Sequence, residues 1–249
     1  MGMTLGIVRP RLMACCFALG SICFLIGPFP GYADLVGDAA DGVTFFVGSI
    51  LFTTGGALQS WMAWPGRRSP DGGRAAWWSS IIQSAGTLFF NITTYQAMHV
   101  LVTSSEYNKL VWRPDWRGSL CFLISGAIAY RASRRHGWHR WLPVRGGSGW
   151  WQPTVNLLGC ILFGISAIAG YVGPSSGSVL DLAAANWTTA LGAACFLACG
   201  VDTLHTGEPA KLPKFHRLHA LERELDQDLE RLEGEPRRAA GPTRDVSKP

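Results

Sequence analysis

Residues 20–24 read GSICF, and residues 48–52 read GSILF. The same template of a glycine, a small residue, two mostly apolar residues and a phenylalanine occurs four more times, as GTLFF at 86–90, GSLCF at 118–122, GCILF at 159–163 and GAACF at 192–196. A glycine and a phenylalanine four residues apart lie on one face of a helix, one turn from each other. Each copy falls within a long apolar stretch, so the repeat predicts how helices pack in a membrane.

The repeated glycine and phenylalanine predict close contacts between helices. In lipid, helices gain nothing from hydrophobic association and adhere through van der Waals packing. A glycine lets two backbones approach, and a phenylalanine one turn away fills the groove beside a neighbour's glycine. The predicted helix-packing residues are Gly20, Phe24, Gly48, Phe52, Gly86, Phe90, Gly118, Phe122, Gly159, Phe163, Gly192 and Phe196. Six copies indicate a repeated unit, a helical hairpin used three times.

The apolar stretches predict an all-α, polytopic membrane protein. Of the 249 residues, 48% are hydrophobic and 16% are charged, and most of the charge lies between the stretches or after residue 204. A helix crosses roughly 30 Å of hydrocarbon with about 20 apolar residues. We expect a transmembrane domain over residues 1–204, with six helices at approximately 12–30, 43–64, 77–103, 112–132, 151–172 and 182–204.

The first stretch has a second interpretation. Arg9 and Arg11 precede an apolar run that ends in Gly31-Tyr32-Ala33, which is also the pattern of a signal peptide with a small-residue cleavage site. The run is long for the hydrophobic region of a signal peptide, and it carries the same pentapeptide as the other stretches. We therefore favour a helix that is retained.

The loops predict that both termini are cytoplasmic. Cytoplasmic loops of membrane proteins collect Lys and Arg. The segment before the first stretch and the loops 65–76 and 131–150 together hold ten arginines, whereas the alternate loops hold only Lys109, Arg113 and Arg117. Arginine and tryptophan are interleaved at 134–141, which we interpret as contact with anionic lipid headgroups and not with nucleic acid.

Two segments carry a resemblance to a known family. DGVTFFVGSILFTTGGALQ at 41–59 and WWSSIIQSAGTLFFNITT at 77–94 resemble the YrhK-like family of bacterial membrane proteins, which has short paired helices with a Gly-Ser-x-x-Phe signature. The likeness is clearest over residues 41–98 and weaker in the later stretches. It implies an integral protein of the bacterial plasma membrane with paired helices, and it brings no activity, substrate or catalytic residue.

Polar residues within the stretches form a candidate site. Gln59, Gln83, Asn156 and Asp202 each fall one to two helical turns from the cytoplasmic boundary, and Asn91 lies deeper toward the outside. These side chains either line a pathway for a small solute or ion, with Asp202 at its inner mouth, or join helices at about 0.6 kcal/mol per hydrogen-bonded pair. An ion or proton path usually needs buried ionisable groups. No such group is expected at mid-membrane, which favours helix joining.

Catalytic and cofactor chemistry has little support in the sequence. No nucleophile elbow, phosphate-binding loop or dinucleotide fingerprint is present. The seven cysteines lie in predicted spans without a histidine or carboxylate pair at metal spacing, and there they behave as small apolar residues. Haem between helices would need paired histidines in the spans, and only His99 lies in one. We expect no enzyme activity, no cofactor and no metal.

The segment after the last stretch is predicted to be cytoplasmic. Residues 205–236 form a linker and an amphipathic helix, and residues 237–249 are expected to be disordered. Spacings of three or four place five leucines on one helix face: Leu218, Leu221, Leu225, Leu229 and Leu232. That face suits a second copy of this chain or another protein, through residues 215–233.

The sequence therefore predicts a non-catalytic membrane protein that acts through helix or tail contacts. The alternative is a transporter or channel for a small solute or ion through the polar layer near the cytoplasmic side. A cavity that reaches Gln83 and Asn156 would favour transport, whereas a tightly packed bundle would favour an interaction protein.

Overall fold

The computed structural model describes residues 2–70, 72–133, 151–174 and 176–206. Apart from one isolated bridge between Val172 and Val179, the regular structure of these residues is helical, which confirms the predicted all-α fold. The elements are α1 (Gly2–Ile26), α2 (Pro30–Val36), α3 (Asp38–Ala63), the 3-10 helix η1 (Trp64–Gly66), α4 (Gly73–Ala97), the π-helix η2 (Asn108–Trp112), α5 (Arg113–Ser133), α6 (Trp151–Ala169) and α7 (Leu182–Thr206). The predicted tail helix and most of the loop 131–150 lie outside the described residues.

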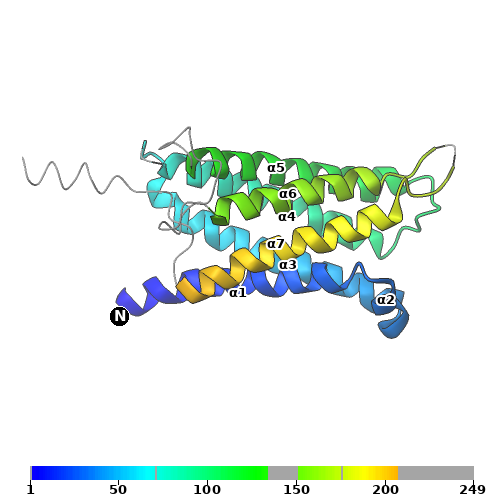
Figure 1. The fold of residues 1–249 in the computed structure, drawn as a ribbon, viewed down its shortest axis with the longest axis horizontal. Coiled ribbons are helices and arrows are strands. Elements are labelled where there is room, and N and C mark those ends of the chain that lie inside the picture. Colours follow the sequence, from blue (N-terminus) through cyan, green and yellow to red (C-terminus); the bar gives the residue numbers. More distant parts are fainter. Residues whose placement is uncertain (1, 71, 134–150, 175, 207–249) are drawn as a thin grey trace, which may run out of the picture. The chain divides into compact units, whose positions relative to one another are not determined.

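The long helices form a closed ring. Each of them packs against the long helix before it and the one after it, and α7 also packs against α1. They run side by side in alternating directions, and the short helix α2 lies at the turn between α1 and α3 (Figure 1). Every long helix therefore has two flanks against protein, one face toward the ring interior and one face outward.

Several predicted boundaries differ from the structure, and the local sequence explains most of the differences. The first helix ends at Ile26 and not at residue 30, because Pro28 and Pro30 cannot donate the next helical hydrogen bonds. Pro30 opens α2, which was predicted to be part of a loop. Gly37, with φ of +86°, reverses the chain so that α3 begins at Asp38, five residues before the predicted start at 43. The third and fifth stretches end at Ala97 and Ala169, before the predicted 103 and 172.

The fourth stretch starts with a π-helix that the sequence did not predict. Residues Asn108–Trp112 form this turn, and α5 continues directly from it at Arg113. Pro114 has no amide hydrogen for a carbonyl one turn earlier, and such a gap is a common cause of irregular helix geometry. Near this turn, the Val111 carbonyl accepts a hydrogen bond from Thr93 Oγ1 of α4, at 3.1 Å.

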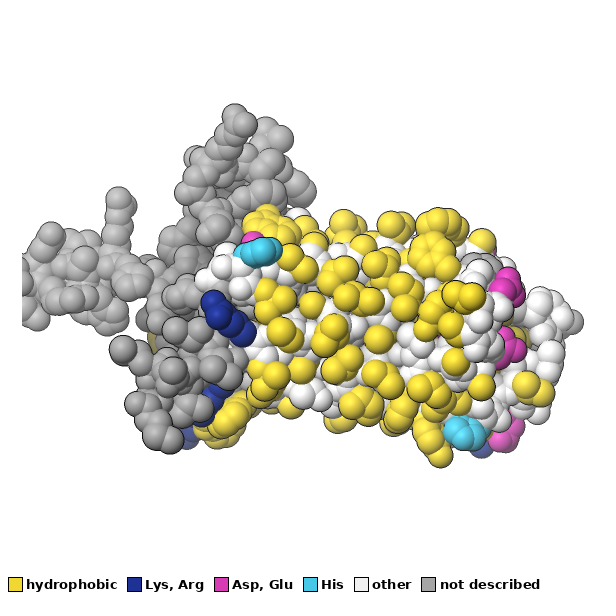
Figure 2. All heavy atoms as spheres, turned by 90° about the horizontal axis from the view of Figure 1, so that it is seen from below, with side chains coloured by type: hydrophobic (Ala, Val, Ile, Leu, Met, Phe, Trp, Pro, Cys, Tyr) yellow, Lys and Arg dark blue, Asp and Glu magenta, His cyan; other side chains and the backbone are white. Residues whose placement is uncertain are grey.

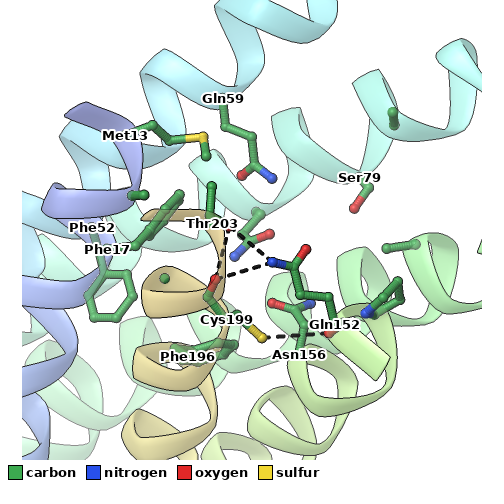
Figure 3. Close-up of a pocket in the computed structure, with 16 residues that line it drawn as sticks. Met13, Phe17, Phe52, Gln59, Ser79, Gln152, Asn156, Phe196, Cys199 and Thr203 are labelled. Carbon is green, nitrogen blue, oxygen red and sulfur yellow. Dashed lines mark hydrogen bonds between the residues drawn. The ribbon is translucent and has the colours of Figure 1, made fainter. Parts of the chain in front are cut away.

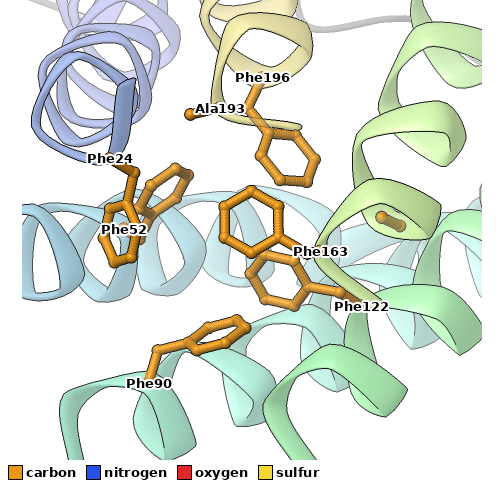
Figure 4. Close-up of a cluster of buried hydrophobic side chains, with 8 residues drawn as sticks. Phe24, Phe52, Phe90, Phe122, Phe163, Ala193 and Phe196 are labelled. Atoms are coloured by element: carbon orange, nitrogen blue, oxygen red, sulfur yellow. The ribbon is translucent and has the colours of Figure 1, made fainter. Parts of the chain in front are cut away.

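The motif phenylalanines meet in the ring interior. Phe24, Phe52, Phe90, Phe122, Phe163 and Phe196, one from each long helix, are 1–5% exposed and belong to one buried cluster. Their rings converge from all sides (Figure 4). The Phe163 ring centroid lies 5.4–6.3 Å from those of four others, Phe24, Phe90, Phe122 and Phe196. We call this cluster the phenylalanine layer.

The motif glycines face the phenylalanines of the neighbouring helix. A Cβ added at Gly20 would lie 3.1 Å from the Phe52 ring, and one at Gly48 would lie 3.0 Å from the Phe24 ring, so the contact between α1 and α3 is reciprocal. The same reciprocal contact joins α4 to α5, through Gly86 with Phe122 and Gly118 with Phe90, and α6 to α7, through Gly159 with Phe196 and Gly192 with Phe163. All six glycines are buried.

The second and third motif positions have opposite environments. The second residues, Ser21, Ser49, Thr87, Ser119, Cys160 and Ala193, are 0–1% exposed. Their hydroxyls bond within the bundle, as when Ser49 Oγ lies 3.0 Å from Thr94 Oγ1 of α4. The third residues Ile22, Ile50, Leu88, Leu120 and Ile161 face outward and are 41–55% exposed. Helices in lipid are expected to place small and polar side chains against one another and large aliphatic side chains toward the outside.

The outer surface fits a membrane protein. Hydrophobic side chains cover the middle of the visible face, with Lys and Arg gathered at one end and Asp and Glu at the other (Figure 2). Within the described residues, four segments are long and apolar enough to cross a membrane: Arg9–Ile26, Asp38–Gly66, Trp151–Ala169 and Leu182–Thr206. The helices α4 and α5 have places in the same ring but are more polar.

The two ends of the ring carry different charges. The basic end holds Arg9, Arg11, Arg67, Arg68, Arg74 and Arg131, and the acidic end holds Asp34, Asp38, Asp41, Glu106, Asp115 and Asp181 together with Lys109, Arg113 and Arg117. At the basic end, the Arg9 guanidinium lies 4.4 Å from the Trp61 ring centroid. The Arg67 guanidinium lies 3.8 Å from the Trp64 ring centroid. Arginine beside tryptophan suits a membrane interface.

Candidate functional site

A cavity lies between the phenylalanine layer and the basic end of the ring. Its volume is about 160 Å³, and Phe52 and Phe196 form part of its wall. The polar side chains that line it come from four helices: Gln59, Ser79, Gln83, Gln152, Asn156 and Thr203. Gln59, Gln152 and Asn156 point toward a common space (Figure 3). We call this the amide cavity.

Gln152 is the best anchored of the four amides. Its Nε2 donates to Thr203 Oγ1 at 3.0 Å and to the Cys199 carbonyl at 3.3 Å, both on α7 (Figure 3). It also donates to Asp202 Oδ2 of the same helix at 2.8 Å. The Cys199 thiol in turn donates to the Gln152 carbonyl at 3.6 Å. These bonds hold the amino end of α6 against the carboxyl end of α7, and they fix the orientation of the Gln152 amide.

Gln83 is held on one side only. Ser125 Oγ of α5 contacts Gln83 Oε1 at 3.3 Å, and the Ser79 and Ser125 hydroxyls bond to each other's backbone carbonyls at 3.0 and 2.8 Å. Gln83 is 6% exposed, and its Nε2 has no acceptor among the described residues. One donor of this amide is therefore available to whatever occupies the cavity.

The other two amides also have unused hydrogen-bonding groups. Gln59 Oε1 is buried and has no hydrogen-bond partner in the described part of the chain. Among the described residues, the hydrogen-bond contact of Asn156 Nδ2 is with the Cys160 sulfur, at 3.9 Å. A buried polar atom without a partner is rare in native structures and usually marks a site for water or a ligand. The amide cavity therefore offers both donors and acceptors to a small guest.

The predicted polar layer is only partly assembled. Gln59, Gln83 and Asn156 line the amide cavity, and Asp202 reaches it through its bond with Gln152. Asn91 lines neither this cavity nor the one described next, and instead bonds to Thr53 Oγ1 of α3 at 2.9 Å, so it joins two helices. Gln152, which lines the amide cavity, was not among the predicted residues.

A second cavity lies on the other side of the phenylalanine layer, toward the acidic end. Its volume is about 270 Å³, and Phe24, Phe90 and Phe163 form part of its wall. Asp115 is the one charged side chain among the described residues that line it. We call this the carboxylate cavity. The sequence interpretation missed Asp115 as a site residue, although the residue falls inside the predicted span 112–132.

The carboxylate cavity owes its wall to the irregular start of α5. Trp112 and Asp115 come from the π-helix and the turn after it, where the helix register changes. Asn108 ties this segment to the end of α6, because its side chain donates to the Val172 carbonyl at 2.7 Å and accepts from the Val172 amide at 3.1 Å. Burial, together with the nearby Asp115 carboxylate, raises the pKa of Tyr107, which keeps this phenol neutral at physiological pH.

The cysteines and histidines do not assemble a metal site in the part of the chain that is described. No group of three or more His, Cys, Asp or Glu side chains lies close enough to hold a metal ion there. All seven cysteines are free, and Cys160 contacts the buried cluster as a small apolar side chain.

Comparison with known proteins gives no further guide, because no family model, no curated protein and no solved structure matches this chain.

Proposed function

We propose that this chain provides a gated pathway for a small, neutral, polar solute across a membrane. The observation that carries the proposal is the pair of cavities on opposite sides of the phenylalanine layer, one of them lined by four side-chain amides. An interior cavity of about 150 Å³ is large enough for a guest the size of benzene. The amide cavity, at about 160 Å³, suits a solute of that size that both donates and accepts hydrogen bonds.

The phenylalanine layer would act as the gate of this pathway. Phe52 and Phe196 line the amide cavity, Phe24, Phe90 and Phe163 line the carboxylate cavity, and no described residue lines both. A transporter needs such a barrier, because a continuous polar pore would leak. The rings are attached to six different helices, so small shifts between helices would move the rings relative to one another.

The proposal includes a topology. All six long helices cross the bilayer, as three related hairpins, with the basic end and both termini in the cytoplasm. Placement of the more polar α4 and α5 in the same ring supports six crossings, and the reciprocal glycine–phenylalanine contacts support three hairpins. The charge difference between the ends agrees with the tendency of cytoplasmic loops to carry Lys and Arg. As parts of this proposal, the protein belongs to the YrhK-like family, has no enzyme activity and resides in a bacterial plasma membrane.

The test is solute entry into liposomes. Purified protein is reconstituted into liposomes, which are mixed with urea, acetamide or glycerol. Light scattering follows how the liposomes shrink and then reswell as the solute enters. We expect at least one of these solutes to enter faster than in protein-free liposomes. Asn156→Leu, which replaces an amide of the amide cavity with an apolar side chain of nearly the same shape, should abolish the difference.

Leu158→Met is the matched control on the same helix, because Leu158 is 49% exposed on the outward face. It should leave the entry rate unchanged. Equal rates in protein-free and wild-type liposomes for all three solutes, or an unaltered rate in Asn156→Leu, would contradict the proposal.

A further inference from the structure

Asp115 brings a carboxyl group into the carboxylate cavity without a protein partner. Its side chain is half-buried, no Lys, Arg or His is among the described residues that line the cavity, and no hydrogen bond or ion pair joins its carboxylate to a described residue. The neighbouring Arg113 and Arg117 are exposed. A charge held away from bulk water is costly unless a counter-charge accompanies it, and an ionisable residue inside a membrane bundle generally has a functional reason.

The hydroxyl groups around the cavity are arranged to accept further hydrogen bonds. Thr93 Oγ1 donates to the Val111 carbonyl at 3.1 Å, and Ser166 Oγ and Thr189 Oγ1 each lie 2.9 Å from the Ala185 carbonyl. Ser166 Oγ and Thr189 Oγ1 also lie 2.6 Å apart, so one of these two hydroxyls donates to the other. A hydroxyl has one hydrogen and two lone pairs, so each of the three oxygens keeps at least one lone pair for a further hydrogen bond. Apart from the Asn186 amide and the Tyr107 phenol, the lining therefore presents oxygen acceptors, which favour a positively charged guest.

Aromatic rings complete the surroundings of Asp115. Tyr107, just before the π-helix, Trp112, at its end, and Phe45 of α3 line the cavity. The Trp112 ring is fixed by its Nε1 bond to the Ala167 carbonyl at 2.7 Å and by an edge contact with Tyr171, with ring centroids 4.9 Å apart. Aromatic faces attract organic cations, quaternary ammonium groups above all. A metal cation would instead need several oxygen ligands at bonding distance, which a cavity of about 270 Å³ with one carboxylate does not supply.

We propose that the carboxylate cavity binds an organic ammonium ion, with Asp115 as its counter-charge and Trp112 and Tyr107 as its aromatic contacts. This binding site is additional to the solute pathway proposed above. It requires no movement across the bilayer, so binding and flux are measured separately and either proposal can fail alone.

The test is calorimetric titration of the purified, detergent-solubilised protein with choline and with n-butylammonium, at constant ionic strength. Choline is compared with 3,3-dimethylbutan-1-ol, which has the same shape without the charge. We expect at least one of the two ammonium ions to bind, and the neutral alcohol to bind at least about tenfold more weakly than choline if choline is the one bound. Asp115→Asn should weaken binding at least about tenfold, because it removes the counter-charge and keeps the size of the side chain.

Asp38→Asn is the matched control, because Asp38 is exposed at the same end of the ring and does not line the cavity. Its affinity should stay within about twofold of wild type. The melting temperature without ligand shows that Asp115→Asn is folded, and it should equal or exceed that of wild type because an unpaired charge has been removed. No binding of either ammonium ion at millimolar concentration, equal binding of alcohol and choline, or undiminished binding by Asp115→Asn would overturn the proposal.

Discussion

The environment of each motif residue follows from its place in the pentapeptide. The first, second and fifth positions face the ring interior, and the third faces outward. Residues at positions one, two and five span about 100° of a helix at 3.6 residues per turn, which is the width of one buried face. The second position is small in all six copies because it is fully buried beside a neighbouring helix. The restriction of the second position to small residues could be seen in the repeated pentapeptide itself.

Gly192→Ala tests the glycine contact. An added Cβ would lie 2.5 Å from the Phe163 ring and 3.1 Å from the Gly159 carbonyl, so the ring and the backbone of α6 must both move. Overpacking of this kind costs about 1–3 kcal/mol, offset by up to about 1 kcal/mol from the better helix propensity of alanine. We expect a melting temperature in detergent several degrees below that of wild type. Gly31→Ala is the control, since no atom lies within 4 Å of its added Cβ, and an equal effect of both changes would refute the contact.

Gln152→Ala and Asp202→Asn form a second pair of changes. The alanine removes the three contacts that the Gln152 amide nitrogen makes to α7, each worth about 0.6 kcal/mol in a membrane protein, so we expect a loss of about 1–2 kcal/mol of unfolding free energy. The asparagine retains an oxygen that accepts from Gln152 Nε2, so stability should stay within about 0.5 kcal/mol. Reversible unfolding in mixed micelles measures both. A larger loss in Asp202→Asn than in Gln152→Ala would show that the carboxylate charge matters more than the amide bonds.

The helices differ in how well they can be predicted from the sequence. Each of the six apolar stretches contains a long helix, because each is long and its prolines lie near or beyond the ends of that helix. The helix ends are harder to predict from the sequence. Pro28 and Pro30 were included in the first predicted span. The helix α2 was missed because its seven residues have no apolar periodicity. The π-helix was missed because Pro114 signals an irregularity without specifying its form. That irregular turn is also where Asp115 enters the ring.

Asn108→Ala tests how the π-helix is tied to the loop after α6. The change removes both hydrogen bonds to Val172, at 2.7 and 3.1 Å. Each such bond contributes about 0.5–1.5 kcal/mol, and the Val172 amide loses its side-chain acceptor. We expect faster amide hydrogen exchange over residues 170–180 and little change in the other loops. Lys109→Ala is the control: its 3.9 Å ion pair with Glu106 is exposed and should matter little, and equal exchange in the two variants would contradict the role of Asn108.

At the scale of the whole ring, the sequence predicted the contacts but not the cavities. The repeat of glycine and phenylalanine is local information, and it identified the side chains that form the phenylalanine layer. A cavity depends on which helices become neighbours, and closure of α7 on α1 was not readable from any one stretch. Gln59, Gln83 and Asn156 were found because depth alone brings them to one level, whereas Asn91 points between α3 and α4 and not into the ring.

Phe163→Ala tests whether the phenylalanine layer separates the cavities. Phe163 contacts four other rings and lines the carboxylate cavity, so its loss should open space toward Phe196 and the amide cavity. Large-to-small changes in a core cost about 3–5 kcal/mol, so the milder Phe163→Leu is measured alongside. We expect liposomes with either folded variant to leak small solutes several-fold faster than wild type. Leu158→Ala on the outward face should not leak, and tight liposomes with both phenylalanine variants would show that the barrier lies elsewhere.

Closure of the ring by α7 has a consequence for biosynthesis. A Cβ added at Gly200 of α7 would lie 3.2–3.4 Å from the backbone of Ala14 and Ala18, so α1 completes its contacts in the ring only after α7 has been synthesised. Until then the growing bundle is open at one side, and the surface of α1 that contacts α7 is uncovered. A chain truncated before residue 182 would leave the α1 surface around Ala14 and Ala18 uncovered. Another helix with small residues could then pack on that surface in the bilayer, or a membrane protease could bind it.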